Sequence, residues 1–205
     1  MRATRASRYR HSNAIFLSVA HLGDWLSRDK CVRIVDTILH HQPTVCVEIG
    51  VFRGQSALVI GEALRKCGHG VLHAVDPWSH EEAIAGSNAT ANNEWWMTVD
   101  LGAAKHEFLA EISKRGLQDY VIPVQSTSED YARQTDFAVD FLHIDGNHSE
   151  EKSCQDVELW LPRLNSGGVI VFDDTDWPTT KRAQVAIEGV ASCIYETGTF
   201  KVYQS

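Results

Sequence analysis

The chain has 205 residues, of which 43% are hydrophobic and 22% charged, which excludes a disordered chain and fits one globular domain. A formal net charge of −8 and a pI of about 5.6 argue against nucleic acid as a partner. The sequence has no apolar run of membrane-spanning length, no signal-peptide pattern and no C-x-x-C pair among its five cysteines, so we expect a cytoplasmic protein without a membrane partner. The sequence makes no prediction of oligomeric state.

The first 40 residues predict a helical segment. Four arginines between Arg2 and Arg10 precede it, and we expect them to form a solvated tail. Apolar residues then recur at helical spacing, with a break near Gly23 and Asp24, in two groups: Phe16, Val19, Ala20 and Val32, Val35, Leu39.

From residue 44 onward, strands and helices alternate. The pattern predicts strands at 44–49, 71–75, 121–124, 139–144 and 169–172, and helices at 55–67, 103–115 and 150–164. The run 169–172 is apolar at every position, which is typical of a strand covered on both faces of a parallel sheet. We therefore predict a single domain, 1–205, with an α/β fold and a doubly wound, mostly parallel sheet.

Two segments depart from this alternation. Residues 193–195 and 200–203 are separated by too few residues for a crossover helix, so they predict a C-terminal antiparallel hairpin. The polar insertion 79–102 contains Trp95 and Trp96. These aromatic side chains could form a lid over a ligand or a small core of the insertion itself.

The end of the first strand carries an unusual turn. Residues 45–56 read V-C-V-E-I-G-V-F-R-G-Q-S, and Gly50 and Gly54 would let the backbone bend tightly and approach a ligand. This spacing is not the G-x-G-x-x-G that binds a pyrophosphate, and Glu48 at the strand tip favours a cationic or hydroxylated ligand. Asp76 ends the next strand, where a carboxylate can bind two ribose hydroxyls. The pattern predicts a nucleoside ligand.

A second group of acidic residues follows the later strands. Asp145 ends the fourth strand, and Asp173 and Asp174 end the fifth, so their carboxylates should meet at one edge of the sheet. Such a cluster is stable when a cation neutralises it, and oxygen ligands favour Mg²⁺. The alternative is that these residues only cap turns. His148 lies three residues after Asp145 and is either a general base or a solvated loop residue.

At this point the sequence resembles a known family. The motifs V-E-I-G-V-F-R-G-Q-S and H-A-V-D-P-W, followed by H-I-D-G-N-H-S-E and G-G-V-I-V-F-D-D, are similar to class I S-adenosylmethionine-dependent methyltransferases. The small enzymes that group with macrocin-type O-methyltransferases and with proteins called cephalosporin hydroxylases resemble it most. The resemblance spans about residues 40–203 and implies a Rossmann-like methyltransferase sheet.

The resemblance also implies roles for individual residues. It places Gly50 and Gly54 beside the methionine part of S-adenosylmethionine with Glu48 close to them, Asp76 on the ribose, and Ser126 near the adenine unless it is a simple turn serine. Ser56 and Asp145 are further cofactor-binding residues. It implies an O-methyltransferase acting on a small sugar, catechol or other diol, with Mg²⁺ or another divalent cation bound by Asp145, Asp173 and Asp174. Asp145 and His148 would be the catalytic residues. Catechol-type relatives have a lysine where His148 stands, so the base assignment stays open.

Three other functions were weighed. A cofactor-binding module without catalysis would keep the same pocket. A nicotinamide-dependent oxidoreductase shares the sheet and the ribose-binding acid, but the missing third glycine and Glu48 argue against it. An iron oxygenase is excluded, because none of the ten histidines lies after His148 to complete a downstream ligand set.

Overall fold

The structure, a computed structural model, describes residues 5–205, with side chains from residue 12 on, so Arg2 lies outside the described residues. Helix α1 (Arg5–Val19) and a 3₁₀ turn (Ala20–Leu22) are followed by α2 (Arg28–His41). The expectation of a tail is therefore wrong for the backbone of residues 5–10, which is the first part of α1. The predicted break falls between the two helices, near Gly23.

The strands form one sheet with the order β3-β2-β1-β4-β5-β7-β6 over the described part of the chain. The first five strands in this order are parallel, whereas β7 is antiparallel to both β5 and β6. The predicted doubly wound sheet with a C-terminal antiparallel hairpin is confirmed. The strands are β1 (Val45–Ile49), β2 (Val71–Asp76), β3 (Val121–Gln125), β4 (Val139–Ile144), β5 (Leu164–Asp173), β6 (Ser192–Glu196) and β7 (Phe200–Gln204).

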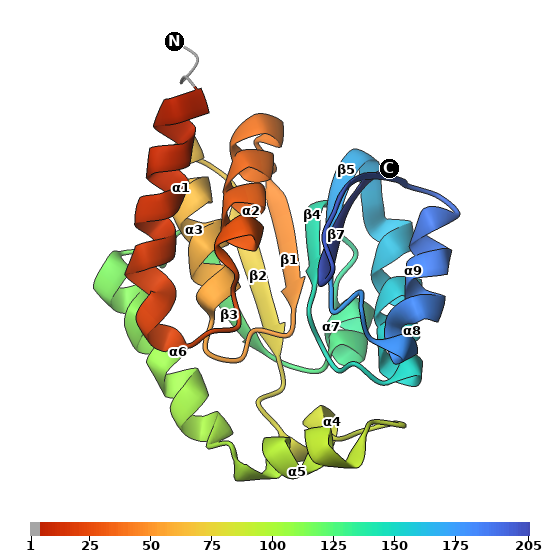
Figure 1. Ribbon diagram of the computed structural model, residues 1–205. Coiled ribbons are helices and arrows are strands. Elements are labelled where there is room, and N and C mark those ends of the chain that lie inside the picture. Colours follow the sequence, from red (N-terminus) through yellow and green to blue (C-terminus); the bar gives the residue numbers. More distant parts are fainter. Residues whose placement is uncertain (1–4) are drawn as a thin grey trace.

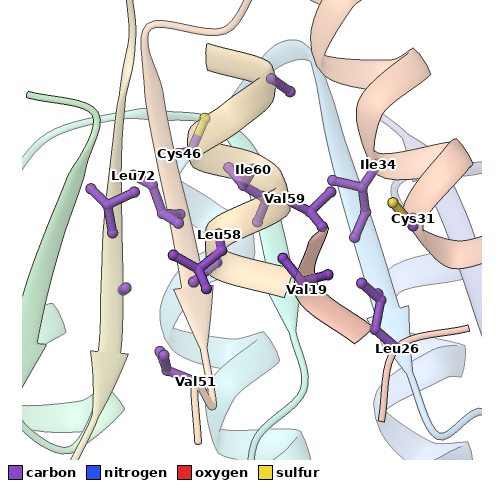
Figure 2. Close-up of a cluster of buried hydrophobic side chains, with 14 of the residues drawn as sticks. Val19, Leu26, Cys31, Ile34, Cys46, Val51, Leu58, Val59, Ile60 and Leu72 are labelled. Atoms are coloured by element: carbon purple, nitrogen blue, oxygen red, sulfur yellow. The ribbon is translucent and has the colours of Figure 1, made fainter. Parts of the chain in front are cut away.

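Helices cover both faces of the sheet (Figure 1). One apolar cluster joins α1, α2, α3 (Gln55–Cys67) and α6 (Leu101–Arg115) to one face. Figure 2 shows part of this cluster, in which α3 lies between Leu72 of the sheet and Ile34 of α2. A second cluster joins the other face to α7 (Ser128–Gln134), α8 (Glu150–Trp160) and α9 (Lys181–Glu188). Both faces are buried, as the uniformly apolar strands predict.

The structure corrects several predicted boundaries. Helix α8 ends at Trp160, and a 3₁₀ turn (Leu161–Arg163) leads directly into a β5 longer than the apolar run suggested. The sequence analysis missed α7 and α9, which have only 7 and 8 residues, too few for a clear helical period. Over residues 5–205, no helix combines the length and the apolar composition that crossing a membrane requires.

The insertion after β2 is helical. It contains α4 (His80–Ala83) and α5 (Thr90–Thr98), and α6 then begins at Leu101. Figure 1 shows α4 and α5 beyond the ends of β1 and β2, where the strand arrows point. The insertion therefore lies at the carboxyl edge of the parallel sheet, where ligands bind in folds of this type.

Candidate active site

A cavity of about 800 Å³ lies at the carboxyl ends of the parallel strands. The loops after β1, β2, β4 and β5 line it, together with the start of α2 and residues of α5. Because parallel strands end at one edge, residues far apart in the sequence meet there. The volume is in the range of cavities that hold a cofactor or a small ligand.

Gly50 and Gly54 have different roles in the first loop. Gly50 lines the cavity at φ 85°, and a Cβ atom there would lie 2.0 Å from the backbone oxygen of Asp145. Gly54 has φ 80° but does not line the cavity, and its Cβ would lie 2.0 Å from the ring of Phe108. The bare Cα of Gly54 allows α6 to pack against the start of α3, and its place beside the cofactor stays a prediction. Ser56, one turn into α3, does line the cavity.

Asp76 organises the first loop and also faces the cavity. One carboxylate oxygen accepts hydrogen bonds from the backbone N–H groups of Val51 (2.8 Å) and Phe52 (2.9 Å), and the other accepts from Trp78 (2.6 Å). Burial raises the pKa of Asp76, although these hydrogen bonds oppose the rise. A carboxylate has about four acceptor positions, so the ribose role predicted for Asp76 stays open to it.

Two predicted cofactor residues lie away from the cavity. Glu48 is fully buried, with Nδ1 of His143 2.7 Å from its carboxylate, and it does not line the cavity. Ser126 donates a hydrogen bond to the backbone oxygen of its neighbour Thr127 (3.0 Å), and Thr127 and Ser128 line the cavity in its place. Glu48 is thus paired in the sheet and the side chain of Ser126 turns to its own loop, so their places close to the cofactor and near the adenine stay predictions.

Lys30, in the first turn of α2, is a site residue that the sequence analysis missed. Its ammonium group contacts the carboxylate of Asp173 and lies 3.4 Å from that of Asp145. Lys30 is only 5% exposed. Burial lowers the pKa of its amine, but Asp145 and Asp173 outweigh this effect and raise the pKa above its ordinary value. No local pattern marks Lys30, because 115 residues separate it from Asp145.

The neighbouring groups form a buried chain of charges. Burial would raise the pKa of Asp173, but the charges of Lys30 and His143 hold it well below its usual range. His143 Nε2 lies 3.6 Å from Asp173, and its other nitrogen contacts Glu48. Burial lowers the pKa of His143, but these carboxylates outweigh it and raise the pKa to about 9. Burial and the charge of Asp173 raise the pKa of Asp145.

The structure divides the predicted cation ligands into two groups. The inner group is His143, Asp145 and Asp173, and the outer group is Asp145, His148 and Asp174; within each, one atom per residue lies within 4.8 Å of the others. Asp173 belongs to the inner group alone, and Asp174, which has a left-handed φ of 50°, belongs to the outer group alone. The predicted set of Asp145, Asp173 and Asp174 is therefore not a single group among the described residues.

His148 completes the outer group. Its Nε2 lies 2.7 Å from a carboxylate oxygen of Asp174, and its ring centroid lies 4.7 Å from that of Trp177. The Nε2 atom is buried, and among the described residues it has no partner in hydrogen-bond geometry. Burial lowers the pKa of His148, but Asp174 outweighs this effect and raises it. A nitrogen and an oxygen in such an arrangement can share a proton or a cation.

The insertion closes one side of the cavity. Trp95 of α5 lies 5.1 Å from Trp25 and 6.2 Å from Phe52, centroid to centroid, and all three line the cavity. Asn147, in the loop after β4, donates from Nδ2 to the backbone oxygens of Glu82 (2.8 Å), Ala83 (3.1 Å) and Ala85 (2.9 Å). The insertion is thus attached to the loop that carries Asp145 and His148.

Comparison with known proteins identifies the family. Residues 47–175, more than half of the chain, match the family described as a methyltransferase domain. The chain belongs to this methyltransferase family, and the resemblance to class I S-adenosylmethionine-dependent methyltransferases is confirmed. Lys30 lies before the matched residues.

Solved structures have the same fold. The chain is similar to an O-methyltransferase from Bacillus cereus in complex with SAH (14% identity, 98% of this chain and 92% of that chain, TM-score 0.63). It is also similar to TomG from Streptomyces achromogenes, an O-methyltransferase of tomaymycin synthesis in complex with SAM (14% identity, 99% and 90%, TM-score 0.64). A third is the SAH-bound methyltransferase PaMTH1 from Podospora anserina (14% identity, 97% and 86%, TM-score 0.62).

Proposed function

We propose that the protein is an S-adenosylmethionine-dependent O-methyltransferase that acts on a hydroxyl group of a small sugar, catechol or other diol. The observation that carries this proposal is one continuous cavity in a methyltransferase-family domain. It is lined by Gly50 and Asp76 and also by Asp145, His148 and Asp174. Two of the similar structures are O-methyltransferases holding SAH or SAM, which supports the same cofactor and reaction here.

The part of the cavity that we assign to the cofactor is lined by acidic side chains and by the backbone at Gly50. S-adenosylmethionine carries a sulfonium cation, and its ribose offers two hydroxyl groups. Asp76 is the residue that we assign to the ribose, and Gly50 is the position where the backbone itself reaches the ligand. Ser56 and Asp145 also line the cavity and are assigned to the cofactor with them. The role of Glu48 would be indirect, through His143.

The outer group fits a divalent cation. Lys30 contacts Asp173 and His143 contacts Glu48, which leaves the carboxylates of Asp145 and Asp174 to neutralise a cation at the outer group. The Nε2 atom of His148, 2.7 Å from a carboxylate oxygen of Asp174, would supply a nitrogen ligand. We therefore assign the cation to Asp145, His148 and Asp174, so that His148 replaces Asp173 in the predicted set of ligands. A bound cation would lower the pKa of the acceptor hydroxyl and orient it toward the methyl group.

The alternative role for His148 is that of the general base, as the sequence analysis predicts. Its imidazole lines the cavity, and a neighbouring carboxylate is the usual partner of a catalytic histidine. A histidine that binds the cation through Nε2 cannot take a proton on that atom. The two roles therefore predict different cation affinities for a His148 variant.

Two measurements test the proposed function. Calorimetry with SAH and with NAD should show binding of SAH alone, and binding of NAD alone would instead indicate an oxidoreductase. Transfer of labelled methyl from S-adenosylmethionine to a panel of catechols, sugars and other diols should then occur, faster with Mg²⁺ or Mn²⁺ than with EDTA. SAH binding without transfer to any member of the panel would instead favour a cofactor-binding module.

A further inference from the structure

Lys30 occupies a position that neither its local sequence nor its helix favours. It lies in the first turn of α2, whose N-terminus is capped by the side chain of Ser27. The N-terminal end of a helix is positively polarised, so a cation is unfavourable there. Lysine is also almost never buried unless it is paired, yet Lys30 is 5% exposed. Such local conflicts are expected where a side chain has a function.

Asp145 and Asp173 resolve this conflict. Lys30 contacts the carboxylate of Asp173 and lies 3.4 Å from that of Asp145, so its ammonium group stands among the inner group. The inner group includes His143, whose Nε2 is fully buried and has no hydrogen-bond partner among the described residues. The ammonium group of Lys30 thus occupies the inner group in place of a metal ion, which would have one imidazole and two carboxylates as ligands there.

We propose that the ammonium group of Lys30 is a resident cation of the active site, which blocks the inner group and confines a divalent metal ion to Asp145, His148 and Asp174. This inference rests on the proposed function, because it concerns the same cavity. Asp145 belongs to both groups, so Lys30 also fixes the position of the carboxylate that the metal ion would share. Asp173 then serves to hold Lys30 and is not a metal ligand.

The charges around Lys30 allow this assignment. Asp145 and Asp173 are the two carboxylates that contact it directly, and Asp174 adds a further negative charge to its surroundings. Once Asp173 is paired with Lys30, the outer group keeps two carboxylates for one divalent ion. A divalent ion at the inner group would meet a positive charge at contact distance, a repulsion that is strong in a buried site.

The test uses Mn²⁺ alone, titrated into the cofactor-free full-length protein and followed by calorimetry and electron paramagnetic resonance. Lys30→Met removes the charge and keeps most of the side-chain volume, so it should bind Mn²⁺ about tenfold more tightly, or better, than wild type. Lys30→Met/Asp173→Asn should lose this gain, because the inner group then lacks a carboxylate. The matched control is Lys152→Met, which removes another cavity lysine, paired with Glu82 at 3.1 Å, and should leave the affinity within about twofold.

A second comparison does not depend on how well Lys30→Met folds. Asp174→Asn and Asp173→Asn both remove one negative charge, but only Asp174 is assigned as a ligand. Asp174→Asn should therefore weaken Mn²⁺ binding about tenfold more than Asp173→Asn does. Equal losses in these two variants, or an unchanged affinity in folded Lys30→Met, would overturn the role of Lys30. The proposed function is read separately, from SAH binding by the wild type.

Discussion

His148 and Asp174 lie 2.7 Å apart, from Nε2 to a carboxylate oxygen, although they follow different strands of the sheet. The pair depends on two structural features. Asn147 attaches the loop after β4 to the insertion, and Asp174 adopts a left-handed φ of 50°, which is uncommon for a residue other than glycine. Backbone strain of this kind concentrates at functional sites, and here it directs a carboxylate at an imidazole.

The first prediction concerns His148→Gln. If Nε2 of His148 is a cation ligand, the affinity of this variant for Mn²⁺ should fall about tenfold or more. Losing a residue that only orients a metal ligand already lowers metal affinity by this amount. SAH affinity should change much less, since the cofactor is assigned to Gly50 and Asp76 and not to His148. Calorimetry with each ligand measures both. An unchanged Mn²⁺ affinity with turnover reduced about 100-fold or more would instead assign His148 as the general base.

The second prediction concerns Asp76→Asn. The carboxylate of Asp76 accepts three backbone hydrogen bonds and is assigned to the ribose, so the change should weaken SAH binding about tenfold or more. It should also lower the thermal midpoint, because the loop after β1 loses charge-assisted acceptors. Calorimetry with SAH and thermal denaturation measure the two effects.

Asp140→Asn is the matched control for that variant. Asp140 accepts from the backbone N–H groups of Thr44 (2.8 Å) and Val45 (3.0 Å), at the opposite end of β1 from the cavity. It should lower stability without changing SAH affinity. If both variants bind SAH as the wild type does, Asp76 has only a structural role and the ribose assignment is wrong.

The sequence predicts which residues lie at the ends of the strands. It predicts less well what the side chains of these residues contact. The carboxylates of Asp76 and Asp145 reach the cavity because strand alternation and the parallel arrangement place them at one edge. Gly54 shows the limit of such reasoning: close approach of a ligand and close packing against Phe108 both require a bare Cα, so the motif cannot distinguish them. No sequence pattern marks Lys30 as a site residue, because only the tertiary fold brings Asp145 and Asp173 next to it.

The third prediction tests the insertion as a lid. Trp95 lines the cavity beside Trp25 and is 39% exposed, so Trp95→Ala should raise the KM for an acceptor from the catechol panel several-fold. The KM for S-adenosylmethionine should change less. Met97 lies on the same helix, is 57% exposed and does not line the cavity, which makes Met97→Ala the control. Equal acceptor KM values for the two variants would assign the tryptophans to the core of the insertion.

The fourth prediction concerns Asp156, on α8. Its side chain is nearly buried beside Gly146 and lines the cavity. Burial raises the pKa of Asp156 to about 7, from an ordinary value of 3.8. In the window between these values the folded protein binds more protons than the unfolded chain. The contribution of Asp156 to the free energy of unfolding is therefore favourable at low pH and is lost as the pH rises through that window.

Asp156→Asn removes this titration while keeping the shape of the side chain. The free energy of unfolding of wild type and variant should be most alike near pH 4, at the lower end of this window, where the carboxyl group is protonated in the folded protein and partly protonated in the unfolded chain. At pH 8 the variant should be more stable than the wild type by roughly 1–3 kcal/mol, because it has no buried charge to accommodate. Urea denaturation at both pH values measures the difference, and the comparison cancels the titration of His143 and other groups common to the two proteins. Parallel pH profiles would mean that Asp156 is ionised at its ordinary pKa in the fold, with solvent or a cavity group stabilising its charge.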